Sequence, residues 1–123
     1  MRKIVYTMIL SICAFAVSAN EMYRASSSGD SGTYFIVSSE KGSDGLINVL
    51  SSRIGKGNAY TDFTKLKVNC ASMQYFELGG SSEDGAKKTP TQPISDWSDS
   101  KWTSLVSGSS KSDLVHYVCK KHK

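Results

Sequence analysis

The stretch YTDFTKLKVNC, residues 60–70, decides the fold of this chain, because its second half alternates between two kinds of side chain. Leu66, Val68 and Cys70 fall on one side, and the lysines and asparagine between them fall on the other. A period of two is typical of a β-strand with one buried face. Residues 73–78 (MQYFEL) follow after a short connection, so we predict that they return as the second strand of an antiparallel hairpin.

The end of the chain carries a helical pattern. In LVHYVC, residues 114–119, the leucine, both valines and the cysteine share one face of a helix, which leaves His116 on the solvent side. Ser110 or Ser112 can cap a helix that begins near Asp113. The predicted fold class is therefore α+β, an antiparallel β-sheet packed by a C-terminal α-helix.

Residues 1–19 have the features of a secretory signal peptide. Two basic residues precede an apolar run at residues 4–17, and a small-residue motif that signal peptidase recognises ends the segment. The run is too short to span a membrane, so we predict no transmembrane segment after cleavage. Cleavage removes Cys13 and leaves Cys70 and Cys119, which in an oxidising compartment allow one internal pairing. We therefore predict a disulfide between them that joins sheet and helix.

We expect no lipid anchor. A lipobox needs a small residue directly before the modified cysteine, whereas Ile12 precedes Cys13 and the apolar run continues beyond it. Because a signal peptide directs export, the predicted location is outside the cytoplasm, either periplasmic or secreted to the cell surface.

Removing 19 of the 123 residues leaves 104, which is enough for one domain. Residues 20–32 are small and polar, and we predict that they form a flexible leader before a single domain at residues 33–123. Within that domain, residues 33–38 (TYFIVS) are rich in β-branched and aromatic side chains and predict a strand.

Two further segments have weaker patterns. At residues 46–54 the side chains of Leu46, Leu50 and Ile54 fall four apart, so a short helix fits slightly better than a bulged strand. Residues 79–95 are rich in glycine, serine and other polar residues, and we predict an exposed loop there.

Charge and motifs exclude several classes of function. The formal charge of +4 falls to +2 when the two basic residues of the signal peptide leave, which gives no basic field suited to nucleic acid. The sequence has no zinc-type cluster, phosphate-binding glycine loop, nucleophile elbow or interpretable carboxylate pair. Its two histidines, His116 and His122, lie late in the chain. We expect no metal, no cofactor, no nucleic-acid partner and no enzymatic activity.

Four aromatic residues are the strongest candidates for contact with a partner, because aromatic side chains dominate binding hot spots. They are Trp97, Trp102, Tyr75 and Phe76. The alternative role, packing in the core over the sheet, is the more common one for such residues.

A set of features in residues 63–120 resembles a known family. The set comprises KLKVNC at 65–70, the aromatic return at Tyr75, Trp102, a Gly-Ser turn at 108–109 and LVHYVC at 114–119. With it, the chain resembles the surface-adhesin protein E family of Gram-negative bacteria. The resemblance implies an antiparallel sheet stapled to a C-terminal helix, and it implies binding of host extracellular-matrix or serum proteins. The founding adhesin is a lipoprotein and its binding segments have no match here, so only the two cysteines are carried over.

These observations favour a small, exported, non-catalytic binding domain, adhesin-like, that contacts a host matrix or serum protein. The alternative is a periplasmic accessory or structural component of an envelope, secretion or pilus assembly, since a strand-rich sheet can accept or donate an edge. A third possibility is a small envelope enzyme or an inhibitor whose 79–95 loop protrudes toward a target.

Overall fold

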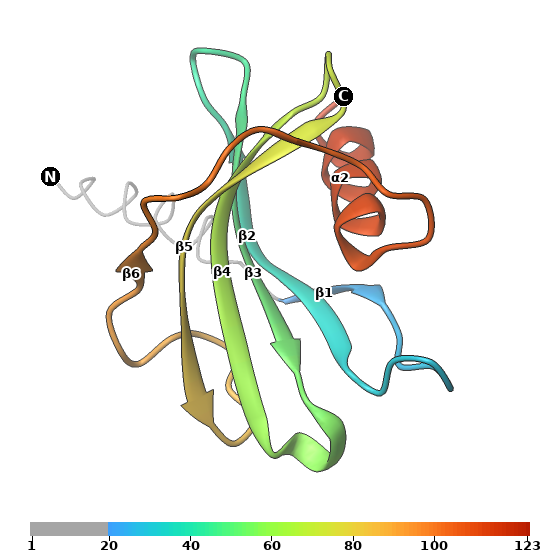
Figure 1. Cartoon of the computed structure of the whole chain (residues 1–123), viewed down its shortest axis with the longest axis vertical. Helices are drawn as coiled ribbons and strands as arrows, with labels where there is room; N and C mark the ends of the chain where they lie inside the picture. The colour runs from blue at the N-terminus through green and yellow to red at the C-terminus, as the bar shows by residue number, and fades with distance from the viewer. Residues whose placement is uncertain (1–19) are drawn as a thin grey trace, which may run out of the picture.

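The structure, a computed structural model, describes residues 20–123, and the predicted signal peptide lies outside them. These residues form a seven-stranded antiparallel sheet with a C-terminal helix, which confirms the predicted fold class (Figure 1). The elements in chain order are β1 (Glu21–Arg24), β2 (Thr33–Lys41), β3 (Ile47–Ile54), the 3₁₀ turn η2 (Lys56–Asn58), β4 (Tyr60–Asn69), β5 (Gln74–Asp84), β6 (Ser95–Asp96), β7 (Thr103–Ser104) and α2 (Ser110–Lys121).

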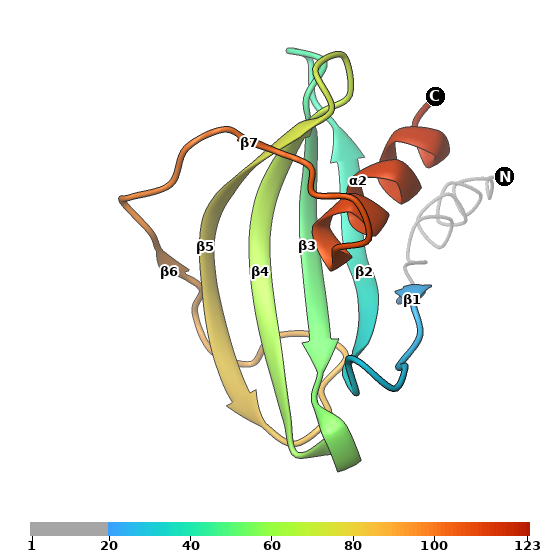
Figure 2. The same cartoon turned by 45° about the vertical axis from the view of Figure 1, so that its right-hand side comes forward.

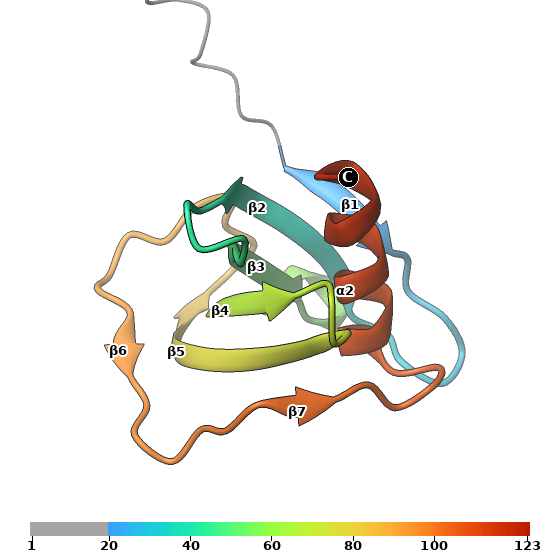
Figure 3. The ribbon, with the colours of Figure 1, turned by 90° about the horizontal axis from the view of Figure 1, so that it is seen from above.

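The strands β1 to β5 pair in chain order as an antiparallel meander (Figure 2). The two-residue strands β6 and β7 both pair with β5, so the chain between them runs along that edge of the sheet. Residues directly opposite each other in neighbouring strands point to the same face. The register therefore divides the sheet into a helix side, which α2 covers in part, and an outer face (Figure 3).

The hydrophobic core lies between α2 and the helix side of the sheet. Leu66 and Val68 of β4 are completely buried there, as the alternation in the sequence predicts. The full set of buried core side chains is Ile36, Ile47, Val49, Leu66, Val68, Leu114, Val115 and Val118. Burial of three apolar residues on one face of a 12-residue helix explains why α2 is stable in this position.

The predicted disulfide is present. Cys70 directly follows β4 and Cys119 lies in the last turns of α2, and their Cα atoms are 5.7 Å apart. Both residues pack against the core cluster. The bond therefore links the centre of the sheet to the helix across 49 positions of sequence.

The prediction of a short helix at residues 46–54 is wrong, because residues 47–54 form β3. Ile47 and Val49 face the core, whereas Leu50 faces the outer side and lines a groove there. Both faces of β3 therefore carry apolar side chains. This conceals the period of two that identifies a half-buried strand.

The flexible leader predicted at residues 20–32 is also wrong. Part of this segment forms β1, which pairs with β2. Glu21 accepts hydrogen bonds from the Tyr117 hydroxyl at 2.9 Å and from Lys121 Nζ at 2.8 Å, both on α2. These bonds keep the pKa of Glu21 below its usual range, with the lysine as the largest cause. These contacts join residues about 100 positions apart in the sequence, so the local composition of residues 20–32 cannot predict them.

The loop predicted at residues 79–95 begins later than expected, because β5 continues to Asp84. Gly79 and Gly80 are buried within this strand. A β-carbon on Gly79 would lie 2.2 Å from the Ser95 carbonyl oxygen, so only glycine allows β6 to approach. The glycines that predict a loop thus mark a close contact between two backbones.

Residues 85–94 cross the outer face of the sheet, on the side away from α2, and hydrogen bonds attach them to it (Figure 2). The Glu83 carboxylate, only 4% exposed, accepts hydrogen bonds from the Thr91 amide at 2.7 Å, the Gln92 amide at 3.1 Å and the Thr91 hydroxyl. These bonds, led by that of the Thr91 side chain, lower the pKa of Glu83. The Thr61 hydroxyl donates to the Gly85 carbonyl at 2.7 Å. Six of the ten residues in this segment are exposed, as predicted, and the bonds to Glu83 and Thr61 hold the loop against the sheet.

Candidate functional site

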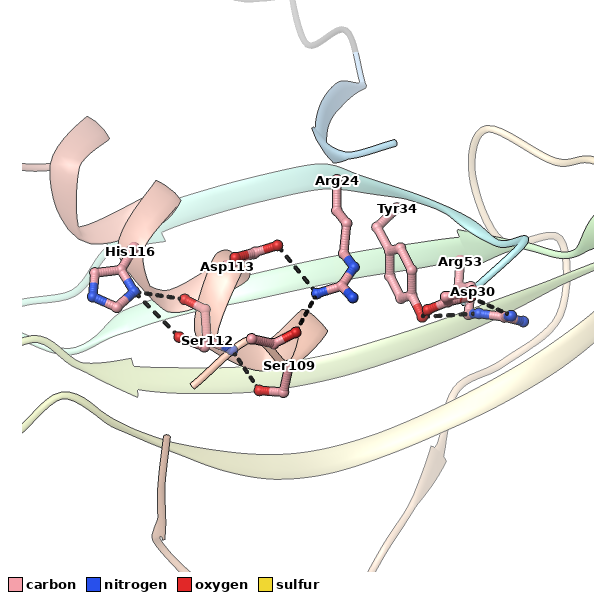
Figure 4. Close-up of polar contacts among 9 residues, drawn as sticks. Arg24, Asp30, Tyr34, Arg53, Ser109, Ser112, Asp113 and His116 are labelled. Carbon is pink, nitrogen blue, oxygen red and sulfur yellow. Dashed lines mark hydrogen bonds and ion pairs between the residues drawn. The ribbon is translucent and has the colours of Figure 1, made fainter. Parts of the chain in front are cut away.

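A cluster of polar side chains lies on the helix side of the sheet, beyond the region that α2 covers (Figure 4). Asp30 Oδ1 and Arg53 Nη2 form an ion pair of 3.0 Å. The Tyr34 hydroxyl donates to Asp30 at 2.6 Å and accepts from Arg53 Nε at 3.0 Å. The tyrosine bond, followed by the Gly32 amide and the guanidinium, lowers the pKa of Asp30 strongly. The cluster is therefore charge-balanced and held in one geometry.

The first turn of α2 faces this cluster (Figure 4). The Ser109 side chain caps the helix by accepting from the Ser112 amide at 3.1 Å, one position earlier than the sequence predicts. Arg24 Nη1 donates to the Gly108 carbonyl at 3.0 Å and to Asp113 Oδ2 at 3.1 Å. These bonds fix the start of α2 against β1.

Between the helix start and β5 lies an open trough, which we call the helix-side groove. It consists of three adjoining cavities of about 210, 500 and 540 Å³. The first two share Asp62 and Thr64, and the last two share Trp97. The groove thus runs across β3, β4 and β5 to the segment after β6.

Trp97 stands in this groove and is 46% exposed. Its ring rests on Gly80, where a β-carbon would come within 2.6 Å of the ring. Two residues beyond Gly80 on β5, the Ser82 hydroxyl donates to Asp62 Oδ1 of β4 at 2.6 Å. The groove therefore presents an aromatic ring beside a set of hydroxyl and carboxylate groups.

A second surface, the outer-face patch, lies on the opposite side of the sheet. The rings of Phe76 and Trp102 pack with centroids 5.5 Å apart, and Lys67 Nζ lies 5.0 Å from the Phe76 centroid. Beside them, an open groove of about 950 Å³ extends toward β2. The outer-face patch consists of Leu50, Lys65, Lys67, Phe76, Leu78, Ile94 and Trp102.

The structure separates the four aromatic residues that the sequence singled out. Phe76 and Trp102 meet in the outer-face patch, whereas Trp97 lies in the helix-side groove. Tyr75 packs against the core on the helix side, and burial raises the pKa of its hydroxyl. Both tryptophans stay exposed, Trp102 to 37%, so neither has the buried core role that such residues often take.

Several groove residues were not predicted from the sequence. Asp30, Arg53, Asp62 and Ser82 come from four different segments and form no motif. Only the fold of the sheet brings them together. Serine, aspartate and arginine are too common on exposed strands to predict a binding site. The pair Gly79-Gly80 is the sequence feature that could have predicted the close approach of Trp97, since glycine within a strand often marks such contacts.

The histidines have local partners. His116 is exposed, as predicted, and its Nδ1 lies 2.8 Å from the Ser112 carbonyl oxygen, which can only accept a hydrogen bond. His122 Nε2 lies 2.8 Å from the Ser39 hydroxyl, and among the described residues no carboxylate hydrogen-bonds to its other ring nitrogen. This pair therefore lacks the third group that orients a catalytic histidine.

Within residues 20–123, no group of three or more histidine, cysteine or acidic side chains is arranged to hold a metal ion. No helix in the same range has the length and apolar character needed to cross a membrane.

Comparison with known proteins finds no match among protein-family models, curated proteins or solved structures. The resemblance to the surface-adhesin protein E family therefore stays a prediction. Function has to be argued from the two surfaces.

Proposed function

We propose that this chain is a small, exported, non-catalytic binding domain that recognises a protein partner through the outer-face patch. The observation that carries the proposal is the pairing of partly exposed apolar side chains with lysines that lack a counter-charge. Within residues 20–123, neither Lys65 nor Lys67 takes part in an ion pair. Leu50, Leu78 and Ile94 lie next to them in the same groove or its border.

The chemistry of the patch defines the partner. Apolar side chains at the centre of an interface supply affinity, and charges at its rim supply specificity and association rate. Two lysines beside an apolar groove fit a protein surface that places carboxylates around one or two apolar side chains. Glu40 also lines the groove, at its β2 end, so the positive potential is strongest toward Phe76 and Trp102.

Two features support a binding role rather than catalysis. Both cysteines of the described chain are bonded to each other and cannot act as nucleophiles. His116 Nδ1 donates within its own helix, and the outer-face patch itself contains lysines and apolar residues but no acid–base pair. The export signal in the sequence and the disulfide both fit a domain that works outside the cytoplasm.

Capture experiments test the proposal. The purified protein is immobilised and exposed to envelope extract and, separately, to laminin, vitronectin and plasminogen, the matrix and serum proteins that the family resemblance implies. The double variant K65E/K67E should lose at least tenfold in affinity for a captured partner, and raising salt should weaken the wild type. The control K56E/K120E makes the same change of net charge at two exposed lysines outside the patch and should bind normally. Equal binding by both variants would remove the patch as the site, and failure in every arm would remove the adhesin function.

A second candidate function is an accessory role in an envelope, secretion or pilus assembly. The observation in its favour is an open edge: β1 pairs with β2 only up to Ile36, so within the described residues 37–41 of β2 have no strand partner on that side. An extended segment of another protein can add to such an edge. Protease added to intact cells separates the two functions, because a surface adhesin is digested and an internal accessory protein is protected.

A further inference from the structure

The helix-side groove has features that the protein-binding proposal does not use. It lies on the opposite side of the sheet from the outer-face patch, and its three cavities share lining residues from one end to the other. Its length, across three strands, suits an extended ligand rather than a compact one. Its lining contains few apolar groups apart from aromatic rings, so an aliphatic ligand would gain little there.

The charges of the groove select against anionic ligands. Arg53 is paired with Asp30, and Lys111 of α2 is paired with Glu77 at 3.3 Å, so the cations nearest the cluster are already neutralised. The carboxylates of Asp62 and Asp96 line the remaining length, with Asp99 and Lys101 at the far end. These acids repel an anionic ligand.

The lining of the groove suits a polyhydroxylated neutral molecule. Trp97 offers a flat, half-exposed ring on which the apolar face of a sugar ring can stack, and Tyr34 offers a second aromatic wall at the other end. Between them, Asp62, Thr64 and Ser82 supply acceptors and donors at fixed positions. Gly80 holds the Trp97 ring against the backbone, so the stacking surface is already in place before binding.

We propose that the helix-side groove binds a neutral oligosaccharide, with Trp97 stacking on one sugar ring and the side chains of Asp62, Thr64 and Ser82 hydrogen-bonding its hydroxyl groups. This site is independent of the protein partner proposed for the outer-face patch, because the two surfaces share no residue.

The two tryptophans allow a direct test, since each lies on a different surface. W102F leaves Trp97 as the single tryptophan, and W97F leaves Trp102. Cellohexaose, maltohexaose and N-acetylchitohexaose serve as neutral probes, with hexagalacturonate and hexalysine as charged ones. At least one neutral hexaose should change the fluorescence of W102F in a saturable way and leave the emission of W97F unchanged.

Calorimetry with the same sugar then measures each contact. W97A and D62N should each weaken binding at least tenfold, whereas W102A and K65E/K67E should bind as the wild type does. W97F, which keeps an aromatic ring, should retain part of the affinity, and circular dichroism checks that every variant is folded. Absence of binding to all neutral probes, stronger binding to a charged probe, or equal loss in W97A and W102A would overturn the proposal. None of these results bears on capture of a protein by the outer-face patch.

Discussion

Asp30 and Arg53 form an ion pair, with 3.0 Å between Oδ1 and Nη2, that ties the segment before β2 to the middle of the sheet. The hydroxyl of Tyr34 contacts both partners, and Arg53 Nη1 donates a further hydrogen bond to the Tyr60 hydroxyl. An ion pair whose members share several further hydrogen bonds stabilises a fold more than an isolated surface ion pair does. This cluster explains why a run of serines and glycines before β2 is held in one place.

The Asp30 cluster predicts a loss of stability in acid. The pKa of Asp30 is lower in the folded chain than in the unfolded one, so its contribution is present above the ordinary aspartate range and is lost as pH falls below about 4. D30N should lower the urea midpoint at pH 7 and should show a smaller further decrease between pH 5 and pH 2. The exposed Asp99, changed to asparagine, is the control. Parallel acid profiles for the wild type and D30N would contradict the prediction.

The disulfide predicts a hierarchy of stability. Replacing Cys70 and Cys119 by serine should lower the free energy of unfolding by about 2–5 kcal/mol, the usual range for a native disulfide in a small secreted domain. Because α2 is a short helix that depends on packing, its amides should lose hydrogen-exchange protection before those of β4. The intact protein should be about 2 Da lighter before reduction than after it, as one bridge requires. Two free thiols in the purified protein would contradict the bond.

The parts of the fold that the sequence predicts correctly are those with one buried face. In the second half of β4 the buried positions alternate through Leu66 and Val68, and in α2 they recur through Leu114 and Val118, so each pattern has a single period. The cysteines at the ends of these two elements then define how they meet. Cysteine counting and two clear periods were therefore sufficient for the fold class.

The wrong prediction for residues 46–54 has a physical cause on the outer face of the sheet. Leu50 lines the groove on that face together with Ile94, where a simple sheet would present polar residues to water. Its apolar character breaks the alternation of β3, and Gly79 and Gly80 conceal the continuation of β5 to Asp84. The groove residues escape prediction because they depend on cross-strand neighbours, which a local pattern cannot show.

The layer formed by residues 85–94 should detach when Glu83 loses its charge. The folded state lowers the pKa of Glu83, so the bonds to Thr91 and Gln92 are complete at neutral pH and weaken as pH falls below about 4. E83Q should imitate this at pH 7, because an amide offers one acceptor oxygen where the carboxylate offers two. We expect faster proteolysis within residues 85–94 and faster amide exchange at Thr91. T103A, beside Tyr75 at the other end of β5, is the control, and unchanged protection in E83Q would count against the clamp.

Gly80 supports the Trp97 ring, and the last prediction tests this contact. A methyl group at Gly80 would lie 2.6 Å from the ring and 2.9 Å from the Phe63 carbonyl oxygen, so the ring has to move. Such overpacking typically costs about 1–3 kcal/mol, and G80A should lower the free energy of unfolding by an amount in this range. In a W102F background, where Trp97 is the only tryptophan, the emission of G80A should shift to longer wavelength as the ring becomes more exposed. Gly29 is the matched control, because nothing lies within 4 Å of its β position, and G29A should change neither stability nor emission. If G80A and G29A behave alike, Trp97 does not rest on the β5 backbone, and the stacking surface proposed for the helix-side groove is lost with it.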